Sequence, residues 1–505
     1  MKRFLALLLL LCICFPLVAC GPTGPGEKPD DLKDNYTFID NVGEHNFEGS
    51  EFVISLRAST EWEIFSEEKN PNACEKAVQD RNTLLENRFN VKITPESIQG
   101  LTADVYANEV LLDLLDGNPD QIDMFLVQRW LSGPIAMTGM LCDLRSEVPY
   151  VKDSIGVSGW WDPKINDCYT VLGRQYVGVS DINLTAISST WAVLFNRTHD
   201  KNYAASTHKK LDQAYTSMYD VVDDGAWTLD NMNLIVKDFW QDNAQVGQIG
   251  QRDESDIFGL SVTSKNHFRE IFTNAFGYEL VENDGENTPQ LMTLTTNMDT
   301  TIRELKKMIS SSGFNNLKLE EPVQNFANGG ALFFCSALSY LESDIIHDSD
   351  IEFGILPYPK ATITQKEYYS GTNDSMSTIL IPFNLSDRIT RTGVMVEAMA
   401  AESHQSVIPA YYEIILKYNA TRDKDSVRMI ETIYRGRRYN LADIHSSAND
   451  FLRVGGDGLT YLLRAMTDQA NSQGPSDYWD GVRDYYSIGL GNLISAYMEL
   501  SMLAG

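Results

Sequence analysis

The stretch Ile122-Asp123-Met124-Phe125-Leu126-Val127 is a short apolar run that leads into the polar pair Gln128-Arg129. An apolar run of this length between polar residues predicts a buried β-strand. Before it, the spacing of apolar residues predicts an amphipathic helix over residues 104–116, and Gly117-Asn118-Pro119 stops that helix. The chain therefore passes from a helix into a buried strand here, and this pattern sets the fold class.

The same alternation runs in both directions from this strand. Strands are predicted at residues 52–56 and 90–93, with a helix over 74–89 between them. Such alternation indicates right-handed crossovers and a mainly parallel sheet. Further on, strands are predicted at 191–196, 258–262, 329–334 and 379–382, helices at about 227–240 and 301–311, and an almost wholly helical end up to Gly505. We therefore predict an α/β fold of two bodies joined by more than one chain crossing.

The N-terminus has the features of an exported lipoprotein. Two basic residues precede an apolar run over residues 4–18, and Leu17-Val18-Ala19-Cys20 resembles the bacterial lipobox. We predict a signal peptide at residues 1–19, acyl chains such as palmitate on Cys20, and a tether rich in Gly and Pro at residues 20–35. Because each buried methylene contributes about 0.8 kcal/mol, several chains anchor a protein stably. The expected location is the outer face of the cell membrane, on the extracellular or periplasmic side.

Composition and missing motifs exclude several functions. A formal net charge of −29 repels phosphate backbones, so nucleic acid is not an expected partner. The common hydrolase, zinc-protease and nucleotide-binding motifs are absent from the sequence, so we predict a non-enzyme without cofactor or metal. Beyond the N-terminal segment, the four cysteines form no C-x-x-C pair, and buried thiols are favoured over one or two disulfides: Cys74, Cys142, Cys168 and Cys335.

Several later motifs follow one another in an order that resembles a known family. They are residues 123–125 leading to 139–144, the stretch 193–197, Gly225-Ala226-Trp227-Thr228-Leu229-Asp230, residues 326–333 and residues 353–359. Over about residues 50–500, this succession resembles family 1 of the extracellular solute-binding proteins of ABC importers, the maltose-binding-protein-like type. The resemblance implies a two-lobed fold of the periplasmic-binding-protein type, with a ligand cleft between the lobes and a helical C-terminal part.

By position, the resemblance also implies lobe boundaries and a function. Lobe one would hold residues 36–190 plus 376–435, and lobe two residues 191–375 plus 436–505, with crossings near 189–191, 373–378 and 435–440. The implied function is a membrane-anchored protein that captures a small solute and delivers it to the permease subunits of an ABC importer. A carbohydrate is the expected solute, and hinge closure of the lobes is the implied mechanism.

Candidate ligand-binding residues come from the same resemblance. Sugars offer hydroxyl groups and apolar C–H faces, so their sites combine aromatic rings with hydrogen-bonding side chains. The candidates are Gln128, Arg129 and Trp130 after the first quoted strand, Ser189, Thr190 and Trp191 at the first crossing, Ser336 after the strand at 329–334, and Asn373 and Asp374 before the next crossing. Each has a structural alternative: a Trp that packs on the lobe edge, a plain crossover strand, or a simple turn. Ser336 falls where the family often presents a Trp to the ligand.

Other readings stay open at this point. Trp160-Trp161 and Tyr478-Trp479 resemble sugar-stacking pairs, although packing is the usual fate of paired aromatic residues. The basic stretch 435–438 is expected to pair with Asp423 and Asp425. Two alternative functions are a SusD-like surface glycan-binding lipoprotein, which would be helical throughout, and a lipid-anchored glycan hydrolase, because a pair of catalytic carboxylates has no spacing rule in sequence.

Overall fold

Strands β1, β2, β3 and β11 form the first sheet of the computed structural model, which describes residues 36–118, 121–207, 210–211, 213, 215–243, 250–285, 287–420, 424–447, 451–454 and 457–503. The predicted signal peptide, Cys20, the tether and Asp423 lie outside the described residues. The strand order is β11-β3-β1-β2, with β1 parallel to both β2 and β3 and β11 antiparallel to β3. The bounds are β1 Ser50–Arg57, β2 Val91–Ile98, β3 Met124–Gln128 and β11 Ser377–Leu380.

Both faces of this first sheet are covered, because alternate side chains of a strand point to opposite faces. In β3, Met124 and Leu126 belong to one buried apolar cluster, and Phe125 and Val127 belong to another. Helices α1 and α14 contribute to the first cluster and α2 to the second. A capping box at Asn72 begins α1. The bounds are α1 Ala73–Phe89, α2 Ala103–Leu115, α3 Arg129–Ala136, α4 Val151–Ser154, α5 Pro163–Cys168, α6 Thr185–Ser188 and α14 Ile389–Glu402.

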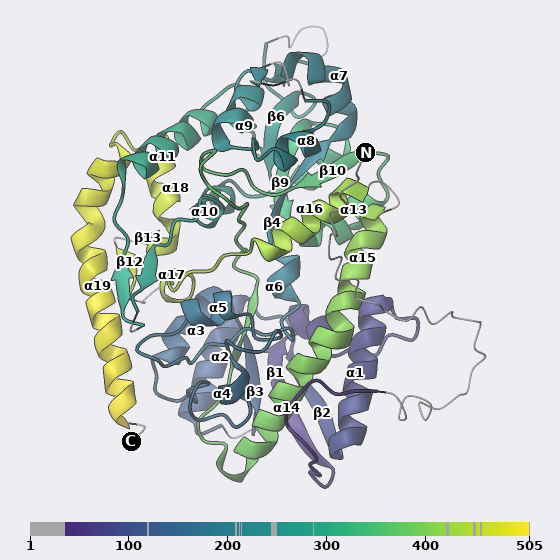
Figure 1. The fold of residues 1–505 in the computed structure, drawn as a ribbon, viewed down its shortest axis with the longest axis vertical. Coiled ribbons are helices and arrows are strands. Elements are labelled where there is room, and N and C mark those ends of the chain that lie inside the picture. Colours follow the sequence, from purple (N-terminus) through teal and green to yellow (C-terminus); the bar gives the residue numbers. More distant parts are fainter. Residues whose placement is uncertain are drawn as a thin grey trace, which may run out of the picture. The chain divides into compact units, whose positions relative to one another are not determined.

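A second sheet has the strand order β10-β4-β9-β6-β5. Figure 1 shows the strands of the two sheets in separate groups, and we call each sheet with its helices a lobe. The bounds of the strands are β4 Trp191–Asn196, β5 Trp240–Gln241, β6 Ile257–Val262, β9 Ala331–Ala337 and β10 Phe353–Leu356. The bounds of the main helices around this sheet are α7 Arg197–Thr207, α8 Met218–Asp223, α9 Leu229–Val236, α10 Lys265–Ala275, α11 Thr296–Ile309, α12 Pro322–Ala327 and α13 Asp344–His347.

The second sheet differs from the predicted parallel arrangement. Strand β6 runs parallel to β9, but β4 runs antiparallel to both β9 and β10. The reason is the path of the chain: β4 begins where the chain enters the second lobe from the first. A strand that starts at the crossing runs opposite to strands that end there, and β11 is antiparallel to β3 for the same reason.

The crossings between the lobes lie side by side. Asn373 N donates to Ser189 O at 2.9 Å, and Trp191 N donates to Gly371 O at 3.0 Å. On the other side of this segment, Arg438 N donates to Ser370 O at 2.8 Å. A Cβ at Gly371 would lie 2.5 Å from Asn274 Nδ2, so the backbone approaches α10 as closely as only glycine allows. The three strand-like crossings therefore form one hydrogen-bonded band.

The helices after α14 pass between the lobes. A π-helical turn at Ser403–Val407 joins α14 to α15, and α16 packs on β10 of the second sheet. Helix α17 then packs on α3 of the first lobe, and α18 packs on α10 of the second. The lobe boundaries given above stay a prediction. The bounds are α15 Ile408–Ala420, α16 Lys424–Arg435, α17 Ala442–His445 and α18 Leu462–Thr467.

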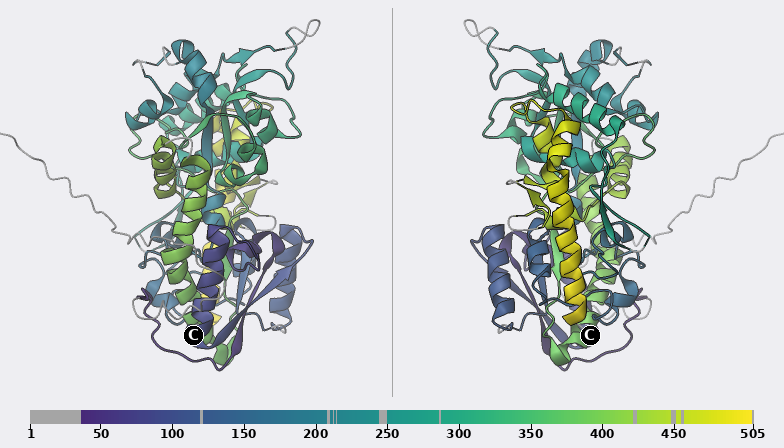
Figure 2. Two further views of the ribbon diagram at one scale, coloured as in Figure 1. Left: turned by 90° about the vertical axis from the view of Figure 1, so that its right-hand side faces the viewer. Right: turned by 90° about the vertical axis from the view of Figure 1, so that its left-hand side faces the viewer.

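A long helix, α19 (Pro475–Leu503), follows these segments (Figure 2). It packs on α11 in the second lobe, and its Tyr497 ring lies 5.6 Å from Tyr176. The two remaining small sheets are β7 Val281–Asn283 with β8 Pro289–Leu291, and β12 Arg453–Val454 with β13 Asp457–Gly458. Among the described residues, no helix combines the length and apolar content that a membrane crossing requires.

Candidate functional site

Arg129 is the centre of a polar cluster between the lobes. It is the first residue of α3, directly after β3, and is 2% exposed. Its Nη1 donates to Thr372 Oγ1 at 2.9 Å, and its Nη2 donates to Asp374 Oδ1 at 3.1 Å. The same Nη1 lies 3.3 Å from Asp443 Oδ2 on α17. One side chain thus joins the first lobe, a crossing and the C-terminal segment.

The electrostatics keep Arg129 charged. Burial opposes the charge, but Asp443, Tyr169 and Asp374 raise the pKa of Arg129 above its ordinary value. Burial also raises the pKa of Asp443, and the guanidinium of Arg129 opposes that rise. Removal of either partner of such a buried ion pair is destabilising, because the other partner is left as an uncompensated buried charge.

Most of the residues predicted for the site lie at this crossing. Gln128 is the β-partner of Ser377, and Thr190 forms a β-bridge with Thr372. The predicted residues that the crossing brings together are Gln128, Arg129, Ser189, Thr190, Trp191, Asn373 and Asp374. Trp130 is half-buried in the first turn of α3. The ligand-binding role of these residues stays a prediction.

Some buried polar atoms at the crossing have no hydrogen-bond partner in the described part of the chain. They include Trp191 Nε1, Gln128 Oε1 and Arg129 Nε. Ser336 differs from its predicted place after the strand, because β9 continues to Ala337 and Ser336 is 1% exposed within it, paired with Ala192. The apolar run extends the strand through this serine. Buried polar atoms of native proteins are usually hydrogen-bonded, so water or a ligand at the crossing can supply partners for these atoms.

Two residues of α10 belong to the cluster and were not predicted. His267 Nε2 lies 3.8 Å from Asp374 Oδ2, and the His267 ring lies 6.3 Å from the Trp191 ring in an edge-to-face arrangement. His267, Glu270 and Asp374 each offer one ligand atom, and these atoms lie within 4.8 Å of one another. Burial and the neighbouring Asp374 raise the pKa of Glu270 to about 8. The three-residue spacing of His267 and Glu270 was the only signal in the sequence.

A cavity of about 390 Å³ also lies between the lobes. The first lobe supplies α5, the second lobe supplies the end of α10 and the loop after it, and the crossings supply the rest. The Arg438 guanidinium lies 4.1 Å from the centre of the Tyr369 ring at its wall. The lining residues are Pro163, Lys164, Asp167, Cys168, Asn274, Gly277, Tyr278, Glu279, Tyr369, Arg438 and Tyr439. Three tyrosine rings and several hydrogen-bonding groups therefore face one space.

The cavity and the polar cluster adjoin each other along α10. Glu270 lies in the cluster and Asn274 lines the cavity, four residues later on the same face of the helix. A second cavity of about 370 Å³ shares Tyr439 with the first, and the β7–β8 hairpin forms part of its wall. None of the nine residues predicted for the site is among the residues that line these two cavities.

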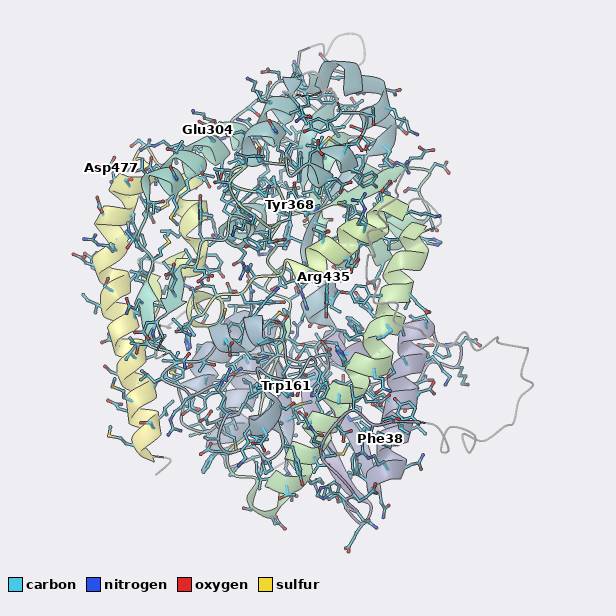
Figure 3. The ribbon with its side chains drawn as sticks, viewed as in Figure 1. Phe38, Trp161, Glu304, Tyr368, Arg435 and Asp477 are labelled. Carbon is cyan, nitrogen blue, oxygen red and sulfur yellow. The ribbon has the colours of Figure 1, made fainter. Side chains whose placement is uncertain are left out.

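Two aromatic pairs serve as packing. Trp160 Nε1 and Trp161 Nε1 donate to the two carboxylate oxygens of Glu397, at 2.9 and 2.8 Å, and both rings are buried. Trp479 is buried in α19 and stacks on Tyr486. The side chains of Figure 3 include Trp161, which lies in the first lobe.

The prediction for the basic stretch 435–438 was wrong where the structure describes it. Arg435 pairs with Glu431, and Asp425 pairs with Arg428 instead. Arg437 is buried, 3.9 Å from Asp162. The helical spacing of α16 decides these pairs, because residues three and four apart are neighbours on a helix. The four described cysteines are free thiols, as favoured above.

The fold and the site together define a two-lobed α/β protein with a polar site and a cavity between its lobes. A cyclo/maltodextrin-binding protein complexed with maltotetraose has the same fold, with a TM-score of 0.50 and 10% sequence identity over 89% of this chain and 97% of that protein. The maltose-binding periplasmic protein MalE from Listeria monocytogenes, in complex with maltose, also has a TM-score of 0.50, with 13% identity over 88% of this chain and 98% of that protein. No family model matches the sequence, and no curated protein matches it. The likeness at these identities concerns the fold.

Proposed function

We propose that this protein binds a small carbohydrate between its two lobes and delivers it to an ABC importer. The cavity lined by both lobes and by the crossings carries this proposal. Tyrosine rings stack on the C–H faces of sugars, and Asp167, Asn274 and Arg438 offer partners for hydroxyl groups. The maltodextrin- and maltose-binding proteins that share the fold support the same class of solute.

The proposed mechanism is a shift between open and closed arrangements of the lobes. The hydrogen-bonded band of crossings acts as the hinge, since a few residues there can absorb a rotation. A solute that contacts both lobes stabilises the closed arrangement by the difference between its affinities for the two states. In this proposal, acyl chains on Cys20 keep the protein at the outer face of the cell membrane, near the permease subunits that receive the solute.

A thermal-shift screen with mono- and oligosaccharides tests the proposal. A solute at 100 times its dissociation constant stabilises the folded state by about 2.7 kcal/mol, which moves the melting temperature measurably. Replacing a half-buried ring of the cavity in Tyr369→Ala should weaken binding about tenfold, because a sugar loses its stacking surface. Tyr485→Ala, at a tyrosine that is 62% exposed on α19, is the matched control and should leave the affinity unchanged.

The screen also separates the alternatives. If no sugar stabilises the protein, the proposed solute class is wrong. If a bound glycan is cleaved, the lipid-anchored glycan hydrolase replaces the binding protein. The helical SusD-like protein is not favoured, because two multi-stranded sheets build the lobes.

A further inference from the structure

One buried carboxyl group between the lobes has no partner. Glu270 is 7% exposed and makes no hydrogen bond or ion pair within the described ranges of the chain. Its carboxylate points into the cluster with His267 and Asp374, where the three ligand atoms lie within 4.8 Å of one another. A buried carboxyl without a partner costs free energy, and no cation of the described residues forms an ion pair with Glu270 itself.

The protein's own cations do not fill this place. Arg129 is engaged by Asp374 Oδ1 at 3.1 Å and by Asp443 at 3.3 Å. The titratable and charged groups that face Glu270 are His267 and Arg269 on α10, Arg129 on α3, Asp374 at the crossing, Asp443 on α17, Tyr461 and, on α18, Arg464. Burial and Asp374 outweigh the three arginines and raise the pKa of Glu270 to about 8, so Glu270 holds a proton at pH 7.

We infer that His267, Glu270 and Asp374 form a subsite for a protonated amine of the solute, so that the bound carbohydrate is an amino sugar. This inference rests on the proposed function. An ammonium group has three N–H donors, and the cluster presents one acceptor from each of three residues. Asn274 lies one helical turn from Glu270 and lines the cavity, so this inference places the sugar ring in the cavity and its amine one turn further along α10.

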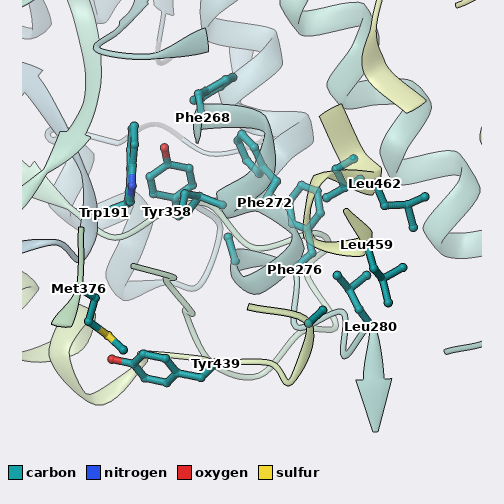
Figure 4. Packing of buried hydrophobic residues seen from close by; sticks show 14 of the residues in the cluster. Trp191, Phe268, Phe272, Phe276, Leu280, Tyr358, Met376, Tyr439, Leu459 and Leu462 are labelled. Carbon is teal, nitrogen blue, oxygen red and sulfur yellow. The ribbon is translucent and has the colours of Figure 1, made fainter. Parts of the chain in front are cut away.

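The surroundings favour an ammonium group over a metal ion. The guanidinium of Arg129 touches Asp374, and a doubly charged ion beside it would meet twice the repulsion that a singly charged amine meets. The rings nearby are Trp191, whose indole N–H finds no acceptor among the described residues, and Tyr358, seen together in Figure 4. An indole N–H can donate to a sugar hydroxyl but cannot bind a metal.

Isothermal titration of the purified protein with glucosamine, glucose and N-acetylglucosamine tests this subsite. Glucosamine should bind at least about tenfold more tightly than the two neutral sugars, because its hydrogen bonds to carboxylates are charge-assisted. Binding at pH 7 should release a proton from Glu270, so the heat should depend on the ionisation enthalpy of the buffer. Glu270→Gln should abolish both effects, so that glucosamine binds no more tightly than glucose. Glu304→Gln, on the surface of α11, is the matched control.

The outcomes of these titrations distinguish a failure of the amine subsite from a failure of the proposed function. Equal binding of all three sugars by the wild-type protein overturns the amine subsite and leaves the proposed function standing. Binding of none of them, with stabilisation by a simple diamine that depends on Glu270, overturns the carbohydrate and keeps the amine subsite. A thermal shift with Zn²⁺ or Ca²⁺ alone that Glu270→Gln removes overturns the subsite in favour of a metal. At pH 7 the melting temperature of Glu270→Gln without solute should be above that of the wild-type protein, because the variant removes the cost of burying this carboxyl. A melting temperature that is not lowered excludes misfolding as the cause of lost binding.

Discussion

The two ends of strand β3 each carry a buried ionic cluster, and the two clusters differ in how completely they are satisfied. At the start of the strand, the carboxylate of Asp123 is fully buried and accepts from Arg388, Arg391, Thr392 and the backbone N of Val53. At the other end, Arg129 holds Asp374 and Asp443, but the carboxyl of Glu270 beside Asp374 has no hydrogen-bond or ion-pair partner among the described residues. Each cluster also keeps one unpaired guanidinium Nε, that of Arg391 and that of Arg129. The same five-residue strand thus separates a cluster whose carboxylate is fully paired, called the complete cluster below, from an incomplete cluster that contains an unpaired carboxyl.

This difference between the two clusters predicts that mutations in them act on different properties, one on stability and the other on solute binding. The complete cluster gives rigidity, because its buried carboxylate has all its partners within the protein. An incomplete cluster costs stability unless something else supplies the missing partners, and Glu270 adds a whole unpaired carboxyl to it. We expect the start of β3 to respond to mutation through unfolding, and its end to respond through solute affinity.

The largest effect should come from breaking the complete cluster. Asp123→Ala leaves two arginines and the buried Val53 N–H without their acceptor, and should lower the free energy of unfolding by about 4 kcal/mol. Urea unfolding followed by circular dichroism measures this. Glu51→Ala, which breaks the exposed pair between Glu51 on β1 and Lys92 on β2, should cost less than about 0.5 kcal/mol. Equal losses in the two variants would show that burial does not distinguish them.

Breaking the incomplete cluster should have a smaller effect on stability and a second effect on binding. Arg129→Met should cost about 3 kcal/mol, since Asp443 stays buried without its cation while Asp374, 23% exposed, can regain water. The same variant should weaken solute binding, measured by titration calorimetry. Arg303→Met, at an exposed ion pair on α11, should do neither. Unchanged affinity in Arg129→Met would separate the Arg129 cluster from the solute site.

The buried carboxyl of Glu63 is only partly paired. Its effect should be the smallest of the three and should appear as a dependence of stability on pH. Glu63 Oε2 accepts from Thr185 N, Thr185 Oγ1 and Ser377 Oγ, whereas Oε1 has no partner among the described residues. Burial raises the pKa of Glu63 from 4.5 to about 7. The folded state therefore binds more protons than the unfolded state between these values, and Glu63 should contribute a fall in stability of about 2 kcal/mol as pH rises from 5 to 8, in addition to the fall that Glu270 causes.

Glu63→Gln removes this titration and should flatten that part of the stability curve. Unfolding by urea at several pH values measures the slope in both proteins. If the variant and the wild-type protein keep the same slope, another group causes the pH dependence.

Much of the fold was predictable because strands and helices leave local patterns. The run at 191–196 matches β4 residue for residue, and the helix predicted over 74–89 is α1. The antiparallel direction of β4 was missed, because direction depends on where a strand enters the sheet, which no local pattern records. A similar limit applied to Ser336, because the strand continues to Ala337, three residues beyond its predicted end at Phe334.

The candidate site was predictable only in part, for a related reason. Arg129 and Asp374 were named from the resemblance, and the structure brings them together. Asp443 and Glu270 join them from helices far along the chain, and their own segments look like ordinary helix surface. Which polar side chains meet between two lobes is decided by the docking of the lobes, so residues such as Tyr369 and Tyr439 became candidates only once the cavity was seen.

The pairing of β11 with β3 has a consequence for the order in which the chain folds. Thr378 Oγ1 donates to Val127 O across 251 residues, so the first sheet stays incomplete until about three quarters of the chain has been synthesised. Until then, one edge of the apolar strand β3 is open to pairing with other chains. Contacts of such sequence separation form slowly, and the open edge is a site for aggregation during that time. The first lobe begins the sequence, yet it is completed only after the whole second sheet has been made.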